Sequence, residues 1–147
     1  MASKKFELEQ VLNYRSEVEK VRKLEFAAAK QEVEHANDVL NRHETAVDTL
    51  SQEFWIRQNE LSTIEEMRRY VDYFARKKED IKSQKERINQ LTCIMSDRRD
   101  ELLDATRDKK VLESLKEKKA REFRQEMAQK EQAFLDEIAI QKKNGPA

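Results

Sequence analysis

Residues 1–144 contain neither glycine nor proline, the two residue types that most strongly interrupt helices. The only glycine, Gly145, and the only proline, Pro146, are adjacent at the C-terminus. Almost the whole chain can therefore form very long helices. The sequence Asn144-Gly145-Pro146 predicts a helix stop and a frayed tail over 144–147. Gly145-Pro146-Ala147 could equally be a cloning remnant.

The composition favours a thin helical rod over a compact globule. Charged residues make up 41% of the 147 residues, hydrophobic residues only 37%, and 30 basic residues balance 30 acidic ones. This is too little apolar surface to offset the chain entropy of a globule. Disorder is disfavoured because the charges are interleaved and apolar residues recur at helical spacing. Each helix would bury one stripe and expose the rest.

Simple sequence features indicate a soluble, cytoplasmic protein. Cys93 is the only cysteine, so no intramolecular disulfide can form, and a reducing compartment is the simplest context. No apolar run is long enough for a signal peptide or a membrane-spanning helix, so no direct membrane insertion is expected.

The segment 59–73 is the one place where a long helix is expected to stop and start again. Ser62-x-x-Glu65 and Thr63-x-x-Glu66 form two overlapping capping boxes, in which a hydroxyl accepts a hydrogen bond from a free backbone N–H. Asn59 could end the preceding helix in the left-handed conformation. The alternative is an unbroken helix with solvated Ser and Thr.

We therefore predict an all-α fold: a long two-helix antiparallel coiled-coil hairpin with an overhanging C-terminal helix. It would be a single domain, 1–147. Helix one would span about 4–59 after an Ala2-Ser3 cap, the turn about 60–64, and helix two about 65–143.

Apolar residues along both helices define a predicted seam. From Ala29 their spacing alternates four and three, the signature of a two-helix coiled coil. Between Tyr14 and Phe26 the pattern needs three consecutive steps of four, a stutter that places Arg22 on the seam. The predicted positions are Leu8, Val11, Tyr14, Val18, Phe26, Ala29, Val33, Ala36, Leu40, His43, Val47, Leu50 and Phe54, then Phe74, Ile81, Ile88, Leu91, Met95, Leu102, Ala105, Leu112 and Leu115.

Polar residues interrupt the second helix's seam at Lys77, Gln84 and Arg98. Such residues cost stability but fix the register of pairing. A functional role for them is the alternative.

A turn near residue 62 places residue 8 roughly opposite residue 116, so residues 119–143 would overhang by about 35 Å. The overhang has an apolar stripe that an isolated helix cannot bury, which indicates a partner. A frayed tail without a partner is the alternative. The stripe consists of Phe123, Met127, Phe134 and Ile138.

A basic excess over 107–124 precedes this stripe and could meet an acidic partner, although a solvated face is the commoner explanation. Balanced net charge and the absence of a base-reading motif argue against nucleic-acid binding.

We find no pattern that indicates catalysis, a metal or a cofactor. One glycine excludes a glycine-rich phosphate loop. His35 and His43 are too far apart on one helix to form a paired metal site. Cys93 without a placed histidine base is not expected to be a nucleophile. No cofactor is therefore expected, and the protein is not expected to be an enzyme.

Four segments, in order, resemble the flagellar export protein FliJ family. They are Lys5-Phe6-x-Leu8-x-x-Val11-Leu12-x-x-Arg15-x-x-x-Glu19, Glu65-Glu66-x-x-x-Tyr70-x-x-Tyr73-Phe74 followed by Ile81, Lys110-x-Leu112-Glu113-x-Leu115-Lys116-Glu117-Lys118, and Leu135-Asp136-Glu137-Ile138-Ala139. The resemblance implies an antiparallel hairpin similar to the stalk of the rotary ATP synthase γ subunit. It also implies a cytoplasmic component of the flagellar type III export apparatus, peripheral to the membrane export gate.

Through the resemblance we expect three partners: the hexameric export ATPase, the export gate membrane protein and the export chaperones. The gate and chaperone surface near the turn would correspond to His43, Val47, Leu50, Phe54 and Tyr73, with Trp55 beside them. Leu50 and Phe54 also fit the seam, so a purely structural role for them stays open.

This chain departs from the family in one respect at that surface. It has Lys77 and Asp80 where the family carries small or apolar residues. At the other end, the overhang residues Phe123, Met127, Phe134 and Ile138 would engage the ATPase. A homodimeric coiled-coil spacer or tether is the alternative function; the export stalk would be monomeric when isolated.

The hairpin can be tested by small-angle X-ray scattering. A continuous helix of this chain would be roughly 200 Å long, whereas the hairpin should stay below about 150 Å. A maximum dimension well above about 150 Å would contradict the hairpin.

Overall fold

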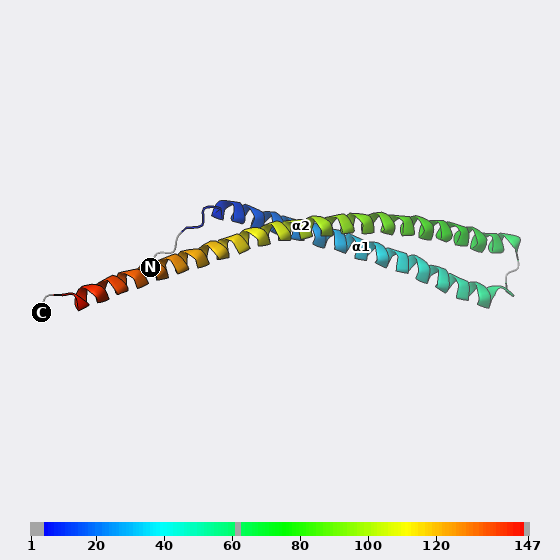
Figure 1. Cartoon of the computed structure of the whole chain (residues 1–147). Helices are drawn as coiled ribbons and strands as arrows, with labels where there is room; N and C mark the ends of the chain where they lie inside the picture. The colour runs from blue at the N-terminus through cyan, green and yellow to red at the C-terminus, as the bar shows by residue number, and fades with distance from the viewer. Residues whose placement is uncertain (1–4, 61–62, 146–147) are drawn as a thin grey trace. The chain divides into compact units, whose positions relative to one another are not determined.

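The computed structural model describes residues 5–60 and 63–145. Within them the chain forms two helices, α1 (Glu9–Arg57) and α2 (Ile64–Lys143), and no strand. The two helices pack against each other in opposite directions and are joined by a short connection (Figure 1). The all-α antiparallel hairpin predicted from the sequence is confirmed.

Two compact units divide the chain: residues 21–102, and residues 1–20 together with 103–147. Each contains a segment of α1 and a segment of α2, and each is described separately below. We call the first the turn unit and the second the terminal unit.

The connection between the helices ends in a capped start of α2. Thr63 precedes the first helical residue, and its Oγ1 accepts a hydrogen bond from the backbone N–H of Glu66 at 3.3 Å. Glu65 and Glu66 lie in the first turn, where the helix dipole favours negative charge. Thr63 therefore acts as the cap of its predicted box, whereas Ser62 and Leu61 lie outside the described residues.

The end of α1 differs from the expectation based on Asn59. The helix ends at Arg57, and the backbone N–H of Glu60 donates to the carbonyl of Arg57 at 2.9 Å, which closes a tight turn. No residue of the described ranges has a positive φ, so Asn59 does not adopt the left-handed conformation. The prediction for Asn59 was wrong because an ordinary turn satisfies the carbonyl that a left-handed cap would have satisfied.

The start of α1 also differs from the sequence expectation, whereas α2 ends at the predicted residue. α1 begins at Glu9 rather than near Lys4, and the predicted Ala2-Ser3 cap lies outside the described residues. At the C-terminus α2 stops at Lys143, with Asn144 N–H still donating to the carbonyl of Ile140 at 2.9 Å. Gly145 has no positive φ, so no left-handed glycine cap ends the helix.

The turn unit has a narrow apolar seam with the predicted spacing. Ala29 and Ala36 on α1 and Leu91 on α2 are its most buried members. Half-buried side chains occupy the other predicted positions: Phe26, Val33, Leu40, His43, Val47, Leu50, Phe54, Phe74, Ile81, Ile88, Met95 and Leu102. The absence of fully buried large side chains among the described residues is what a two-helix layer allows, because each seam residue has only one helix to pack against.

Polar seam residues of α2 make specific contacts with α1. Lys77 Nζ lies 3.1 Å from His43 Nδ1, and Gln84 Nε2 donates to the backbone carbonyl of Ala36 at 2.8 Å. A slip of the pairing would leave these partly buried groups without their partners, and such a loss costs more than an apolar mismatch. The contacts support the interpretation that Lys77 and Gln84 fix the register.

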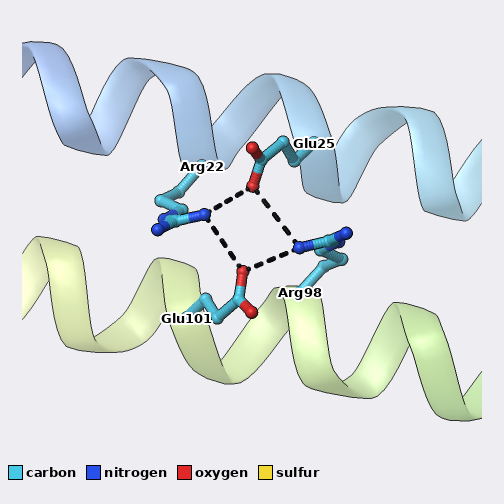
Figure 2. Close-up of polar contacts among 4 residues, drawn as sticks. All are labelled: Arg22, Glu25, Arg98 and Glu101. Atoms are coloured by element: carbon cyan, nitrogen blue, oxygen red, sulfur yellow. Dashed lines mark hydrogen bonds and ion pairs between the residues drawn. The ribbon is translucent and has the colours of Figure 1, made fainter.

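Arg98, the third polar seam residue, belongs to a ring of four alternating charges between the helices (Figure 2). Arg22 Nη1 lies 2.9 Å from Glu25 Oε2 and 3.3 Å from Glu101 Oε2. Arg98 Nη1 lies 3.1 Å from Glu101 Oε2 and 3.8 Å from Glu25 Oε2. Arg22 lies at the seam, as predicted, and here ionic contacts replace an apolar layer.

The terminal unit corrects the predicted start of the α1 seam. Leu8, Val11 and Tyr14 are exposed, whereas Leu12 is buried and Glu19 is only 5% exposed. The inward positions of α1 are Leu12, Arg15, Glu19, Arg22 and Phe26, which alternate three and four without interruption. The stutter was a wrong prediction. Arg15, Glu19 and Arg22 occupy the inward heptad positions. A search for apolar residues alone therefore selected Val11 and Tyr14, which lie on the neighbouring, exposed face of α1.

Ion pairs join α1 and α2 along this polar part of the terminal unit. Lys109 Nζ lies 3.3 Å from Glu19 Oε1, and hydrogen bonding to that carboxylate, followed by its charge, raises the pKa of Lys109. Arg15 lies 3.3 Å from Asp108. Because Glu19 is buried, its carboxylate depends on the contact with Lys109. The Arg15–Asp108 pair is more exposed and contributes little to stability.

The overhang is the part of α2 beyond the start of α1. Lys116 Nζ lies 2.9 Å from Glu9 Oε2, at the first residue of α1. α2 continues to Lys143, and the orange-to-red end of its ribbon extends beyond the blue start of α1 (Figure 1). The residue pairing agrees with the predicted register of residue 8 opposite residue 116.

We expect Glu101→Gln to destabilise the hairpin by about 1 kcal/mol, because it removes carboxylate contacts with Arg22 and Arg98. Thermal unfolding followed by circular dichroism would measure the change, and about 1 M salt should shrink it by screening. The matched control is Asp104→Asn, whose exposed pair with Arg107 spans 3.9 Å. Equal effects of the two variants would contradict a special role for the ring.

Candidate partner-binding surfaces

The predicted gate and chaperone residues divide into a packed group and an exposed one. His43, Val47, Leu50 and Phe54 are half-buried along the α1 seam, and His43 contacts Lys77. Most of their accessible area is already used in pairing the two helices. Their positions favour the structural role for Leu50 and Phe54 that the sequence left open.

Phe54 is the centre of an aromatic cluster at the turn end of the hairpin. Its ring centroid lies 5.3 Å from that of Tyr70 and 6.3 Å from that of Phe74, with tilted and edge-on geometry. Such pairs add to the stabilisation from apolar burial. The cluster ties the last turn of α1 to the first turns of α2.

A small polar network surrounds this cluster. Tyr70 donates its hydroxyl hydrogen to Glu53 Oε1 at 3.3 Å, and Arg57 Nη1 lies 3.3 Å from the same oxygen. The hydrogen bond to Glu53, followed by the charge interaction with Tyr70, raises the pKa of Arg57. Arg57 therefore stays charged and helps to hold the end of α1 against α2.

Tyr73 lies between the packed and the exposed groups. It is half-buried, and Lys77 Nζ lies 5.7 Å from its ring centroid. Tyr73 and Leu50 line a shallow depression of about 370 Å³ together with charged residues of both helices. A partner can reach the Tyr73 side chain there, but only in a polar setting.

Trp55 is the predicted residue that the structure leaves available, at 71% exposed. Further large apolar side chains near the turn are also exposed, and we call the whole set the turn-end patch: Trp55, Ile56, Ile64, Met67 and Val71. Ile64, Met67 and Val71 follow at i, i+3 and i+7, so they share one face of α2.

Sequence reasoning did not assign Ile64, Met67 and Val71 to a surface. Spacing alone could not do so, because Met67 continues the heptad of Phe74 and Ile81 and yet is exposed. Exposed apolar side chains in such a group are typical of protein-interaction sites.

The predicted ATPase residues at the terminal end are also not equivalent. Phe134 is 60% exposed, and Ile138 is half-buried. Leu135 is an exposed apolar neighbour that sequence reasoning missed. We call the group Phe134, Leu135 and Ile138 the distal stripe. No part of α1 lies opposite it, since α1 begins at the level of Lys116.

Phe123 and Met127 have an intramolecular neighbour that the sequence did not predict. Both are half-buried, and they line a groove of about 960 Å³ together with Phe6 and Leu8 of the segment before α1. The expectation that all four overhang residues lack intramolecular neighbours is therefore wrong for this pair. The groove forms because residues 5–8 lie along α2 instead of continuing the α1 helix.

Over residues 5–60 and 63–145 no group of His, Cys, Asp and Glu is arranged to hold a metal ion. Cys93 is exposed. Neither described helix contains a stretch apolar enough to cross a membrane.

Comparison with known proteins places the chain among flagellar proteins. The family model described as Flagellar FliJ protein matches residues 3–145, nearly the whole chain. The chain belongs to the FliJ family, and membership implies a role in flagellar export. Neither the curated proteins nor the solved structures yielded a match.

Neighbouring residues at the turn end should respond differently to truncation. Phe54→Ala removes a half-buried ring from the aromatic cluster, and we expect a loss of about 2 kcal/mol. Trp55→Ala removes an exposed side chain, and we expect a change within about 0.5 kcal/mol. Thermal and urea unfolding of the two variants would measure both, and equal destabilisation would contradict the division into packed and exposed residues.

Proposed function

We propose that this protein is the non-enzymatic stalk and adaptor of the flagellar type III export apparatus. In this role it engages the hexameric export ATPase and couples it to the export gate and the export chaperones. Family membership supports the export role. The turn unit carries the turn-end patch and the terminal unit carries the distal stripe, and two such groups of exposed apolar residues support an adaptor with two binding surfaces.

The observation that carries the proposal is the exposed distal stripe on a continuous helix. Phe134 and Leu135 expose more than half of their surface, although α2 is helical throughout this region. An exposed apolar face on an ordered helix favours burial against a partner, worth roughly 25 cal/mol per Å² of apolar surface. A stalk that enters the channel of a ring needs such a face.

Charge around the overhang suits a partner of mixed charge. Part of the basic excess over 107–124 is used within the protein, because Lys109 pairs with Glu19 and Lys116 pairs with Glu9. Lys119 and Arg124 belong to the overhang and line the groove beside Phe123, and Lys119 Nζ lies 3.9 Å from Glu122 Oε2 on the same helix. They can complement acidic groups of an ATPase channel.

At the turn end, the proposed gate and chaperone surface is led by Trp55 and extends over the turn-end patch. Tyr73 contributes from its shallow depression, while His43, Val47, Leu50 and Phe54 position this end by packing. Trp and other large apolar side chains dominate binding energy at protein interfaces. In this proposal the protein acts in the cytoplasm, at the periphery of the membrane export gate, without a cofactor.

Phe134→Ser with Ile138→Ser tests ATPase engagement. The double variant should keep the melting temperature within about 3 °C, because no α1 residue packs on these side chains, and it should weaken ATPase stimulation about tenfold. Stimulation is measured as ATP hydrolysis by the purified export ATPase against stalk concentration.

The matched control for this experiment is Val21→Ser with Leu24→Ser, which removes exposed apolar side chains of α1 outside both surfaces. It should leave stimulation unchanged. Early unfolding of the Phe134/Ile138 variant, with stimulation per folded molecule intact, would show that these residues stabilise the hairpin instead.

The second candidate function is a homodimeric coiled-coil spacer, which the same exposed distal stripe also favours. The hairpin pairs its own seam, so we expect the isolated protein to sediment as a monomer at micromolar concentration. Analytical ultracentrifugation measures this directly. A stable dimer under these conditions would favour the spacer.

A further inference from the structure

The start of α1 brings an N-terminal segment onto the overhang. The helix begins at Glu9, whose N–H donates to the carbonyl of Phe6 at 3.2 Å, while Leu12 N–H donates to the carbonyl of Leu8 at 2.9 Å. A turn thus precedes the helix and changes the direction of the chain. The ion pair between Glu9 and Lys116, with contacts at 2.9 and 3.1 Å, fixes this point against α2.

The residues just before this point share a groove with the first half of the overhang. Phe6 is half-buried and lines the groove with Phe123 and Met127, which are half-buried in turn. Further along α2, beyond the reach of this groove, Phe134 is well exposed. The apolar stripe of the overhang therefore has a proximal part whose groove is also lined by Phe6, and a distal part outside that groove.

The position of Phe6 in this groove has an energetic consequence for any partner. A ligand that buries Phe123 and Met127 must enter the groove that Phe6 also lines, and it competes there with closure by Phe6. Its apparent affinity is reduced by the fraction of molecules in which the groove is closed. The distal stripe, by contrast, needs no displacement and can make the first contact.

We propose that residues 5–8 form an autoinhibitory strap that covers Phe123 and Met127 and must move for full ATPase engagement. The proposal rests on the proposed function, because it names the regulation of that same binding surface. Phe6 is the positioning residue of the strap, and the Glu9–Lys116 pair is its hinge point.

The strap has a readout that needs no partner. Oxidation of methionine by hydrogen peroxide follows side-chain exposure, and Met127 lies in the groove. Met67, exposed in the turn-end patch, serves as the internal reference. Peptide mass spectrometry gives the sulfoxide formation rate of each methionine in the full-length protein.

We expect Phe6→Ser to raise the oxidation rate of Met127 about threefold relative to Met67, because it uncovers the groove. Phe6→Leu keeps an apolar side chain and should stay near the wild-type rate. Tyr14→Ser, an exposed aromatic of α1 outside the groove, is the matched control and should not change it. Circular dichroism confirms that each variant is folded.

In ATPase titrations, Phe6→Ser should lower the half-saturating stalk concentration about two- to fivefold. An unchanged Met127 rate in Phe6→Ser would overturn the strap whatever the ATPase does. A faster Met127 rate with an unchanged half-saturating concentration would overturn its inhibitory role. If wild type and all variants fail to engage the ATPase, the proposed function is wrong, and the inhibitory role of the strap is wrong with it. A raised Met127 oxidation rate in Phe6→Ser would still establish the covering contact.

Discussion

The register of antiparallel pairing depends on polar contacts between α1 and α2. A two-helix seam presents a single apolar layer, and alanines supply much of its most buried surface, at Ala29, Ala36 and Ala105. Small side chains let the helices approach but discriminate weakly between neighbouring registers. Hydrogen bonds such as Gln84 to the Ala36 carbonyl have one correct partner, and leaving a partly buried group unsatisfied costs about 1–3 kcal/mol. Ion pairs between α1 and α2 also favour one register: the charge ring in the turn unit and the Glu19–Lys109 pair in the terminal unit.

This reliance on polar contacts also decides how much the sequence could predict. The hairpin was predicted from the capping boxes and the family resemblance, the Thr63 cap from capping chemistry, and the seam from Ala29 onward from apolar spacing. The structure shows all three. The seam before Phe26 was misplaced because Arg15, Glu19 and Arg22 occupy its heptad positions, so Val11 and Tyr14 looked like the core. Exposure of Ile64 and Val71 depends on which helix face meets α1, and the sequence of one helix alone does not fix that.

Packing divides the candidate site residues more sharply than their sequence positions do. Phe54 and Trp55 are neighbours in the chain, yet one joins Tyr70 and Phe74 in the aromatic cluster and the other is 71% exposed. A helix turns by about 100° per residue, so adjacent side chains necessarily serve different surfaces. Phe54 helps to build the hairpin end by packing, whereas Trp55 belongs to an exposed face. A resemblance that assigns both residues to one surface cannot separate these roles.

The overhang must remain helical without a second helix beside it, and its polar side chains explain how it does so. Lys130 lies 3.4 Å from Glu126, and Gln132 donates to Asp136 at 3.0 Å; each pair is one turn apart on the surface of α2. Such pairs add about 0.2–0.5 kcal/mol each to a helix rich in strong helix formers. The apolar side chains at Phe134 and Ile138 are then not needed for helix formation and stay available. A partner that binds them meets an ordered helix, so little of its binding free energy is lost to ordering this segment.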